Sequence, residues 1–445
     1  MSGRPPLPGG PYLVVGLVRS GSAAALALRA RGARVIGVDA GRPDVGRLRA
    51  AGVEVHLDAA GTELVAQAGA LVKSPGVPQE APVVRAARAR GIPVLGELEL
   101  AWRMLDNDFL AVTGTNGKTT TTELLGHIHR AAGLPVAVAG NVGTAVAALV
   151  GSVDRAATIV CEASSFQLED TIAFAPEGAL LLNVEPDHLD RHGTLEAYRA
   201  AKLEAFRRQG PDAVAVAPPE LADLLPGAAR RVTFGGDGAT IALGDDGVIR
   251  WRGEPLLPAA EIRIPGPHNV ANAMAAAGLA LARGIDPDAV RAGLRTFPGV
   301  AHRLELVAER DGVRYVNDSK ATNVASVLVA LRAYGAPGRP VVHLIAGGVT
   351  KAQDFAPLAP LVAERCRTVH LIGEGAGEIA AALAPAAAAG VAVAQAGDLE
   401  RALAAARAAA RPGEVVLLSP ACASFDQYAS FEARGDHFRR LVEEA

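Results

Sequence analysis

Short apolar runs alternate with amphipathic stretches along most of this chain. The first run covers residues 12–16, and a turn containing Gly21 leads from it into a stretch rich in Ala, Leu and Arg, then to a second run at 34–39. Apolar runs of this length bounded by turns are typical of buried strands, whereas the stretches between them have the period of helices. The order strand, helix, strand predicts a parallel sheet with helices packed on it, which is the α/β class.

The same alternation continues in two further segments. The central segment has apolar runs that each end in polar residues, at 109–113, 158–162 and 179–184. The last segment has runs at 313–317, 340–348, 369–373 and 414–419. A chain of 445 residues exceeds one ordinary core, so we expect more than one domain. The predicted domains are residues 1–98 and 300–445, both Rossmann-like, with a central parallel-sheet domain at 99–299.

Composition narrows the class of protein. Hydrophobic residues make up 50% of the chain but aromatic residues only 4%, so we expect cores built from Ala, Val and Leu. A net charge of −3 gives no sign of a nucleic-acid surface. Cys161, Cys366 and Cys422 are too scattered for a disulfide framework or a metal site, which predicts buried thiols in a reducing compartment. With no signal-peptide pattern and no apolar stretch that could span a membrane, we expect a soluble cytoplasmic protein.

Lysine is unusually rare. Only five of the 44 cationic side chains are lysines: Lys73, Lys118, Lys202, Lys320 and Lys351. Since arginine has replaced lysine elsewhere, a retained lysine indicates a task that needs a compact ammonium or an amine able to lose its proton. Codon bias plus chance is the other interpretation, and the neighbouring residues decide between the two. Lys73 is the one lysine to which the sequence assigns no chemistry.

The strongest local signal is the stretch 109–120, in which an apolar strand leads through a glycine loop into a helix. Glycines let backbone N–H groups converge on phosphate oxygens, and the helix N-terminus adds partial positive charge. Lys118 can reach the β- and γ-phosphates, and Thr119 can ligate Mg²⁺. Val112 stands where the usual Walker pattern has a glycine. The stretch predicts a P-loop ATPase-type sheet in the central domain.

Two other strand ends in the central segment carry groups suited to a metal and nucleotide site. The run at 158–162 ends in Glu162, and a carboxylate at the end of a buried strand is what a Mg²⁺-nucleotide site requires. The next run leads to His188, which lies among three carboxylates, and the helix after it carries Lys202. Taken singly, Glu162 can be a solvated strand end, His188 structural and Lys202 a surface lysine. Because the three residues occur at or after neighbouring strand ends of one segment, we favour a functional site.

The turn after the first strand differs from a dinucleotide fingerprint. It runs from Gly16 to Gly21, and Val18 occupies the position of the second glycine, which normally lets the pyrophosphate approach the backbone. The turn therefore argues against NAD. A domain that holds a different nucleotide part, or no ligand, remains open at this point.

Several short sequence motifs resemble those of the Mur ligases, and they occur in the same order along the chain. They are residues 113–119, 162–168, 187–188, 268–272, 302–303 and 317–322. The match extends over all three segments. The stretches 419–427 and 431–432 are similar to the C-terminal signature of the family member that adds D-glutamate.

The resemblance implies an ATP-dependent amide ligase of cytoplasmic peptidoglycan precursor synthesis. ATP would phosphorylate the alanyl carboxylate of UDP-N-acetylmuramoyl-L-alanine, and the amine of D-glutamate would attack the acyl phosphate. Two Mg²⁺ ions and several lysines would neutralise the phosphates and the developing charge. We expect a monomer with no nucleic-acid partner and no membrane insertion.

The resemblance also implies roles for individual residues. The catalytic set is Lys118, Glu162, His188, Lys202, Lys320 and His302. The ATP-binding set is Gly114, Thr115, Asn116, Gly117, Lys118, Thr119, Thr120, Asn269, Asn272, Arg303 and Asp318. The set that binds the UDP substrate is Ser20, Arg42, Ser74, Asn141 and His188. The D-glutamate set is Thr322, Lys351, Ser424 and Phe431. The metal ligands are Thr119, Glu162, His188 and Lys202, the last as a carbamate.

Two positions depart from the family pattern, and three alternatives stay open. Val349 replaces an acid that close relatives usually carry, and Arg19 is bulkier than expected beside the uridine site. The same ligation with L-glutamate is one alternative. The second alternative is another Mur-type or folylpolyglutamate-type ligase, although the chain lacks the Asp-Asn-Pro-Arg motif of the diamino-acid-adding relatives. A non-catalytic nucleotide switch, from a different class, would need the phosphate loop but not His188 or Lys202.

Overall fold

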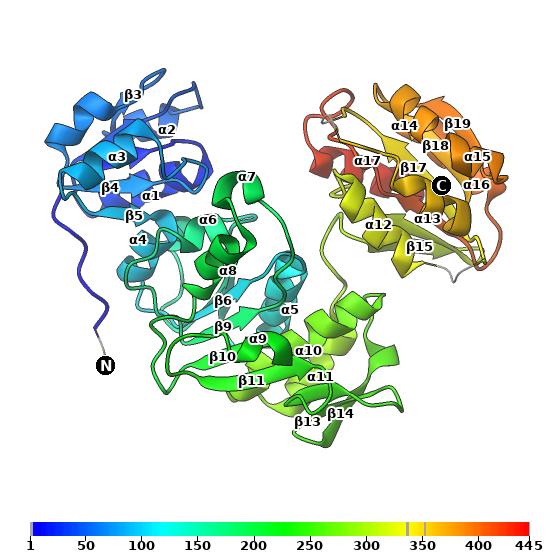
Figure 1. Cartoon of the computed structure of the whole chain (residues 1–445), viewed down its shortest axis with the longest axis horizontal. Helices are drawn as coiled ribbons and strands as arrows, with labels where there is room; N and C mark the ends of the chain where they lie inside the picture. Colours follow the sequence, from blue (N-terminus) through cyan, green and yellow to red (C-terminus); the bar gives the residue numbers. More distant parts are fainter. Residues whose placement is uncertain (1–2, 335–337, 351–352, 445) are drawn as a thin grey trace. The chain divides into compact units, whose positions relative to one another are not determined.

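The computed structural model describes residues 3–334, 338–350 and 353–444, whose strands form three sheets (Figure 1). The chain divides into two compact units. Unit 1 contains Met1–Ile262 and Val270–Thr296, and unit 2 contains Arg263–Asn269 and Phe297–Ala445. The α/β class and the three-sheet organisation are confirmed. The domain boundaries at residues 98 and 299 stay a prediction.

The first sheet, in unit 1, is entirely parallel and has the order β3-β2-β1-β4-β5. Its strands are β1 (Tyr12–Val15), β2 (Val35–Val38), β3 (Glu54–His56), β4 (Ala70–Lys73) and β5 (Val94–Gly96). The associated helices are α1 (Arg19–Ala30), α2 (Gly46–Ala50), η1 (Thr62–Gln67), α3 (Pro82–Ala89) and α4 (Glu97–Met104). Tyr12 and Val14 face one hydrophobic cluster while Leu13 and Val15 face another. Because both faces are buried, the strand is apolar at every position.

The second sheet, also in unit 1, has the order β14-β13-β12-β11-β10-β9-β6-β8-β7. Its strands are β6 (Phe109–Thr113), β7 (Val136–Gly140), β8 (Thr158–Glu162), β9 (Gly178–Leu181), β10 (Val214–Ala217), β11 (Arg230–Gly235), β12 (Ile241–Leu243), β13 (Val248–Trp251) and β14 (Glu254–Pro258). The connecting helices are α5 (Lys118–Ala131), η2 (Val146–Leu149), α6 (Ser165–Leu168), α7 (Leu189–His192), α8 (Leu195–Leu203), α9 (Pro219–Ala222), η3 (Ala259–Glu261), α10 (Pro267–Ala282) and α11 (Pro287–Thr296). The strands predicted at 109–113, 158–162 and 179–184 are β6, β8 and β9.

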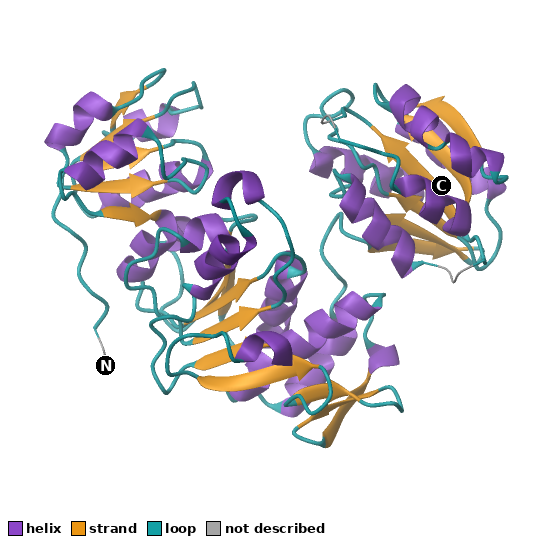
Figure 2. Cartoon of the chain, in the orientation of Figure 1, coloured by secondary structure: helices purple, strands orange, loops and turns teal. Residues whose placement is uncertain are grey.

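The third sheet, in unit 2, has the order β15-β16-β20-β17-β18-β19. Its strands are β15 (Glu305–Arg310), β16 (Val313–Asn317), β17 (Val342–Gly347), β18 (Cys366–Ile372), β19 (Ala392–Gly397) and β20 (Val415–Leu418). The helices are α12 (Val324–Ala333), α13 (Leu358–Arg365), α14 (Ala376–Ala382), α15 (Ala384–Ala388), α16 (Leu399–Ala409) and α17 (Phe431–Glu443) (Figure 2). Alternate residues of β20 enter two different hydrophobic clusters, so helices cover both faces of this sheet.

The parallel sheets predicted for the second and third segments carry additional antiparallel strands at their edges, which the sequence did not indicate. In the second sheet β13 pairs antiparallel with both β12 and β14, and in the third sheet β15 pairs antiparallel with β16. Both additions are short hairpin connections, which antiparallel strands permit and parallel strands do not. The parallel central strands that carry the predicted site residues are unaffected.

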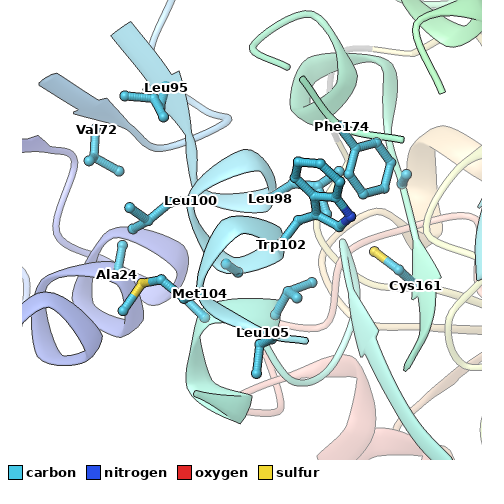
Figure 3. Close-up of a cluster of buried hydrophobic side chains, with 14 of the residues drawn as sticks. Ala24, Val72, Leu95, Leu98, Leu100, Trp102, Met104, Leu105, Cys161 and Phe174 are labelled. Carbon is cyan, nitrogen blue, oxygen red and sulfur yellow. The ribbon is translucent and has the colours of Figure 1, made fainter. Parts of the chain in front are cut away.

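Helix α4 places one hydrophobic core between the first and second sheets. Leu98 and Trp102 of α4 lie with Val72 and Leu95 of the first sheet in the same buried cluster as Phe174, which precedes β9 (Figure 3). The Trp102 and Phe174 rings meet edge to face with centroids 5.8 Å apart. The two sheets of unit 1 are therefore joined by a common core.

Replacement of Phe174 by Ala is expected to lower the free energy of unfolding of unit 1 by about 3–5 kcal/mol, because the ring is fully buried and leaves a cavity. Both tryptophans, Trp102 and Trp251, belong to unit 1, so their fluorescence during urea unfolding reports this change. Ile172→Ala is the matched control, since Ile172 is 47% exposed and its loss should cost no more than about 0.5 kcal/mol. Equal effects of the two substitutions would contradict this account of the core.

All three cysteines are buried thiols, as predicted. Among the described residues, no helix combines the length and the apolar character needed to cross a lipid bilayer.

Candidate functional site

The predicted phosphate loop connects β6 to α5, and two of its glycines have backbone angles and surroundings that exclude a side chain. Gly117 has φ +83°, and a Cβ there would lie 2.4 Å from Oδ1 of Asn272 in α10. Gly114 has φ +150°, and a Cβ there would lie 2.9 Å from Cβ of Leu182, directly after β9. The loop is therefore packed closely between α10 and the end of β9. This packing places Asn272, a predicted nucleotide ligand, beside the loop.

Asn183 holds the phosphate loop, and the sequence did not identify it. Its Oδ1 accepts hydrogen bonds from the backbone N–H groups of Thr115 at 3.0 Å and Asn116 at 2.8 Å. Asn116 in turn donates from its side chain to Glu185 at 2.8 Å. The residues after β9 thus fix the conformation of the loop. The available signal was an asparagine at the end of a predicted strand, next to two other polar strand ends.

Lys118 and Lys202 converge on the same carbonyl group of the loop. Lys118 Nζ donates to the carbonyl oxygens of Gly114 at 3.0 Å and Thr115 at 2.9 Å. Lys202 Nζ donates to Gly114 O at 2.6 Å, and lies 4.2 Å from the centroid of the Tyr198 ring. Two lysine amines so close to one loop favour the binding of an anion.

The Lys202 amine is nearly inaccessible to solvent and has an unusual proton affinity. The residue is 1% exposed, and burial together with repulsion from Lys118 lowers its pKa to about 7. A large fraction of this amine is uncharged at neutral pH, whereas an ordinary lysine is almost fully protonated. An uncharged amine has a free electron pair and is a nucleophile, a property that arginine does not share.

Glu162 and Asn141 lie together at the ends of β8 and β7. Asn141 donates from Nδ2 to Glu162 Oε1 at 2.9 Å and from its backbone N–H to Glu162 O at 2.9 Å. Gly140 has φ +125°, and a Cβ there would lie 2.1 Å from Glu162 O, so only glycine allows the two strands to end side by side. A single carboxylate is thereby presented, oriented by an amide, at the end of the sheet.

His188 lies in the loop between β9 and α7, with a left-handed backbone (φ +51°). Its ring centroid is 5.0 Å from that of Phe166 and 6.2 Å from that of Tyr198, and about half of the side chain is exposed. His188 and Lys202 were predicted to serve the same metal ion. The Tyr198 ring lies close to both residues, which the sequence did not indicate.

Two of the four predicted metal ligands, Thr119 and Glu162, carry oxygen donors that suit Mg²⁺, whereas His188 carries a ring nitrogen. Within the described residues, no three or more His, Cys, Asp or Glu side chains lie close enough together to hold a metal ion. The predicted set contains only two such residues, Glu162 and His188, and adds the hydroxyl of Thr119 and the amine of Lys202. Hydroxyl and carboxylate oxygens are the donors Mg²⁺ prefers. A lysine amine becomes an oxygen donor only after carbamylation.

A cavity of about 820 Å³ opens beside the carboxyl ends of the first sheet. Ser20, Ser74 and Asn141, three of the residues predicted to bind the UDP substrate, line it. Arg42 does not line the cavity, and its guanidinium forms an exposed ion pair with Asp58. The cavity occupies the position at which open α/β sheets bind ligands.

Three further residues shape this cavity. Val18 lines it and is 71% exposed, so the side chain that replaces the fingerprint glycine faces the open space. Arg19 donates to the carbonyl oxygen of Asn141 at 2.7 Å, which explains how a bulky residue is accommodated in this turn. Asp39, at the end of β2, was not singled out from the sequence. Its carboxylate accepts backbone N–H groups of Leu17 at 2.6 Å and Gly41 at 2.8 Å.

In unit 2, His302, Lys320 and Phe431 form a second cluster of predicted site residues. Asn317 donates from Nδ2 to Nδ1 of His302 at 3.1 Å, and the backbone N–H of Lys320 donates to His302 O at 3.0 Å. Lys320 Nζ lies 5.9 Å from the centroid of the Phe431 ring. Burial lowers the pKa of His302. A Cβ on Gly435 would lie 2.1 Å from the His302 ring, so the glycine is needed for this packing.

Asp318 is buried at the end of β16. Ser419 Oγ donates to its Oδ2 at 2.8 Å, and the backbone N–H of Leu304 donates to its Oδ1 at 3.2 Å. Burial raises the pKa of Asp318 to about 7, although the charge of Arg303 opposes this shift. Asn269, a further predicted nucleotide ligand, donates from its side chain to Pro265 O at 2.7 Å. Within the described part of the chain, Arg303 Nε is buried and has no hydrogen-bond partner.

The predicted glutamate residues are only partly described. Lys351 lies outside the described residues. Ser424 is 2% exposed, and among the described atoms its hydroxyl has no hydrogen-bond partner, as expected of a group that awaits a ligand. Val349 forms two backbone hydrogen bonds with Ala423, at 2.9 and 3.1 Å, so the segment before Lys351 pairs with the segment before Ser424. The acid absent at position 349 is not needed for this pairing.

Arg434 was not predicted from the sequence and is the central residue of unit 2's polar network. It is 1% exposed and donates to Ser319 O at 2.9 Å, Ser319 Oγ at 3.0 Å and Cys422 O at 3.1 Å. It therefore joins the segment that carries Lys320 to the segment that carries Ser424. Arg434 was missed because it lies in the amphipathic sequence of α17, which contains other arginines, and nothing local marks it as buried.

Comparisons with known proteins match all three segments. The models that match are the MurD-like N-terminal domain of Mur ligases at residues 11–96, the Mur ligase middle domain at 112–280 and the Mur ligase glutamate ligase domain at 302–422. A protein of Pelotomaculum thermopropionicum named UDP-N-acetylmuramoylalanine--D-glutamate ligase is 44% identical, over 97% of this chain and 96% of its own length. A protein of the same name from Frankia casuarinae is 45% identical, over 97% of this chain and 93% of its own length.

Solved structures show the same fold at lower identity. UDP-N-acetylmuramate-alanine ligase MurC from Thermotoga maritima superposes with a TM-score of 0.63 at 20% identity, covering 98% of this chain and 99% of that chain. MurF from Acinetobacter baumannii superposes with a TM-score of 0.60 at 18% identity, covering 97% of this chain and 93% of that chain.

Proposed function

The chain belongs to the Mur ligase family, and from this premise we propose that it uses ATP to join D-glutamate to UDP-N-acetylmuramoyl-L-alanine. Two relatives more than 40% identical over nearly the whole chain carry the name of that activity. The observation that carries the proposal chemically is the buried Lys202 amine at the phosphate loop, whose pKa is lowered to about 7. Simple nucleotide binding does not require an amine that can lose its proton, whereas carbamylation does.

The reaction consists of two balanced steps. An oxygen of the alanyl carboxylate forms a bond to the γ-phosphorus of ATP as the bond to the β-phosphate oxygen breaks and ADP leaves. The amine nitrogen of glutamate then attacks the acyl carbon, the nitrogen loses a proton, and inorganic phosphate leaves as the amide forms. Both steps bring anions together, so the site has to position them and neutralise their charge.

In unit 1, the phosphate loop supplies the ATP site. The backbone N–H groups at the start of α5 point toward the phosphates, and Lys118 provides a mobile positive charge. Thr119 and Glu162 would hold one Mg²⁺, and His188 with carbamylated Lys202 would hold a second. Mg²⁺ at these places would neutralise phosphate charge during transfer. Carbamylation converts the Lys202 cation into an anionic oxygen ligand.

In unit 2, we assign nucleotide contacts to Arg303 and Asp318, with Asn269 as a further candidate. The backbone N–H of Lys320 donates to the His302 carbonyl oxygen, and the Lys320 ammonium would stabilise the charge on the reacting phosphoryl group. Thr322, Ser424 and Phe431 would receive the incoming glutamate, and Lys351 would pair with its side-chain carboxylate.

The cavity of unit 1 is proposed to hold the uridine diphosphate part of the substrate. Its apolar wall around Val18 suits a base, and Ser20, Ser74 and Asn141 supply polar contacts. We place the reaction in the cytoplasm, where nucleotide substrates are found, and propose the monomer as the active form.

The test is ADP release in the presence of ATP, Mg²⁺ and UDP-N-acetylmuramoyl-L-alanine, with D-glutamate, L-glutamate or meso-diaminopimelate as the acceptor. We expect turnover with D-glutamate and little with the other two. Turnover only with L-glutamate would change the assigned substrate, and turnover only with diaminopimelate would assign another ligase of the family. Nucleotide binding without any amide product would leave a nucleotide switch as the function.

Arg434→Met is expected to raise KM for D-glutamate at least about tenfold. The buried carbonyl groups of Ser319 and Cys422 would lose their donor, at a cost of roughly 1–3 kcal/mol each, and the segments beside Lys320 and Ser424 would separate. KM for ATP should change less. The exposed Arg440→Gln, on the same helix, is the control. If Arg434→Met lowered thermal stability but left KM for glutamate unchanged, the assigned role would be wrong.

A further inference from the structure

Lys73, the lysine with no assigned chemistry, is one of the most deeply buried charged residues of unit 1. It ends β4, and its side chain is 0% exposed. Its ammonium nitrogen lies 2.7 Å from Oδ2 of Asp170, a residue that follows α6 in the second sheet's part of unit 1 and is 5% exposed. A buried ion pair therefore connects the two sheets that share unit 1.

The same ammonium also shapes the wall of the cavity. Lys73 Nζ donates to Val77 O at 2.7 Å, which closes the turn formed by residues 74–77. The Val77 N–H donates to Ser74 O at 3.0 Å across this turn. Residues 74–78 all line the cavity, so the position of one wall depends directly on the Lys73 side chain.

Asp170 connects this turn to β5 and to the segment after α6. Its Oδ1 accepts a hydrogen bond from Gln79 Nε2 at 2.7 Å, and its carbonyl oxygen accepts the backbone N–H of Gly96 at 3.0 Å. Asp170 directly follows the segment of α6, and Gln167 of that helix lines the cavity. Helix α6 begins at Ser165, three residues after Glu162, with Ser164 as its N-cap, so Asp170 is also close in sequence to the proposed metal ligand.

We propose that the Lys73–Asp170 ion pair fixes the turn at residues 74–78 to the segment after α6, and that both residues are positioning residues for the uridine diphosphate part of the substrate. The inference rests on the proposed function, since it takes the occupant of the cavity to be a uridine nucleotide. Removing Lys73 leaves the Asp170 carboxylate buried without its cation, and removing Asp170 leaves Lys73 with the more distant Glu169, at 4.0 Å. Without Lys73, the carbonyl oxygen of Val77 in the turn at residues 74–77 is left with the longer hydrogen bond from Arg191, at 3.3 Å.

The experiment compares steady-state constants for Lys73→Met, Asp170→Asn and the double variant. For each single variant we expect KM for UDP-N-acetylmuramoyl-L-alanine to rise at least tenfold, with KM for ATP and for D-glutamate within about twofold of the parent. The value of kcat at saturation should fall no more than about threefold. Because both changes break one pair, the double variant should raise KM no further than the stronger single variant does.

Arg103→Met is the matched control. Arg103 and Glu99, both in α4, form an ion pair at 2.7 Å whose side chains are 8% and 0% exposed, and neither residue lines the cavity. Arg103→Met should lower the unfolding temperature and leave KM for the UDP substrate within twofold. Inhibition by UDP alone gives a second measurement, and UDP should inhibit Lys73→Met at least tenfold more weakly than the parent.

The outcomes separate this inference from the function itself. A parent enzyme that makes no product and does not bind UDP would refute the proposed function. A parent that turns over normally, with Lys73→Met and Asp170→Asn both losing stability but keeping the parent KM, would show a merely structural pair and overturn the inference. Multiplicative effects in the double variant would also overturn it. If Lys73→Met does not fold, the isosteric Asp170→Asn decides the question alone.

Discussion

Lys202→Arg is expected to abolish turnover, with kcat falling by about 10³-fold or more. The guanidinium keeps its proton at any accessible pH and so cannot attack carbon dioxide to form a carbamate. The buried site would then hold a fixed cation next to Lys118 in place of an anionic metal ligand. Added bicarbonate should not restore activity. ADP release under saturating substrates measures the effect, and circular dichroism establishes that the variant is folded.

A spectroscopic test makes this prediction independent of activity. In ¹³C-labelled bicarbonate, the parent protein should show a carbamate resonance in its ¹³C spectrum that Lys202→Arg lacks. Glu196→Gln, on the exposed side of the same helix α8, should retain both the resonance and the activity. Wild-type-like turnover of Lys202→Arg, or a carbamate resonance that persists in it, would rule out the carbamate.

The pH dependence follows from the same amine. Its pKa of about 7 is lowered from the usual value, so the uncharged form dominates above about pH 7 and the protonated form below. Because only the uncharged amine reacts with carbon dioxide, carbamate occupancy should decline as pH falls below about 7. In that range, added bicarbonate should stimulate the parent enzyme more strongly than at higher pH. A bicarbonate response that is independent of pH would contradict the assignment of a low pKa.

Lys118→Met should lower kcat by roughly 10²–10³-fold, the range found when a donor to transition-state charge is lost. Lys118 Nζ already lies on the loop, held by the carbonyl oxygens of Gly114 and Thr115, and can move from them to phosphate oxygens without displacing the backbone. Methionine has similar length and bulk but carries no charge. Rapid-quench measurement of ADP formation in a single turnover separates this step from product release.

The control for Lys118→Met is Arg130→Gln, which removes one cation from the far end of the same helix α5. Arg130 is about half exposed and its ion pair with Glu123 is 4.0 Å long, so its loss should change kcat less than twofold. Comparable losses in the two variants would indicate a general effect of charge on α5. A single-turnover rate for Lys118→Met close to that of the parent would contradict the assignment of the phosphate loop.

The sequence predicted the strand ends well because their signal is local. An apolar run followed by a short polar motif indicates both the strand and the residues at its end. Glu162 was therefore placed correctly at the end of β8, and the phosphate loop between β6 and α5. Parallel strands bring such ends to one edge of a sheet. The proximity of Asn141 to Glu162 follows from the same rule, since β7 and β8 are neighbours.

The partners of buried charged residues could not be predicted, because they come from distant parts of the chain. The residues around Lys73 in the sequence do not indicate that its partner is Asp170. Those around Arg434 do not indicate that it binds Ser319. Each pairing depends on how separate elements pack, and burial of the charge is itself a tertiary property. The antiparallel additions β12–β14 and β15 were missed for a related reason, as their short, partly polar strands lack a clear alternation.

The most direct test of the central claim follows one oxygen atom through the reaction. UDP-N-acetylmuramoyl-L-alanine labelled with ¹⁸O in its alanyl carboxylate is incubated with ATP, Mg²⁺ and D-glutamate, and the inorganic phosphate is analysed by mass spectrometry. An acyl-phosphate ligase transfers one labelled oxygen to each phosphate released, in step with amide formation. Release of unlabelled phosphate would contradict the account, and so would release of labelled phosphate in the absence of D-glutamate.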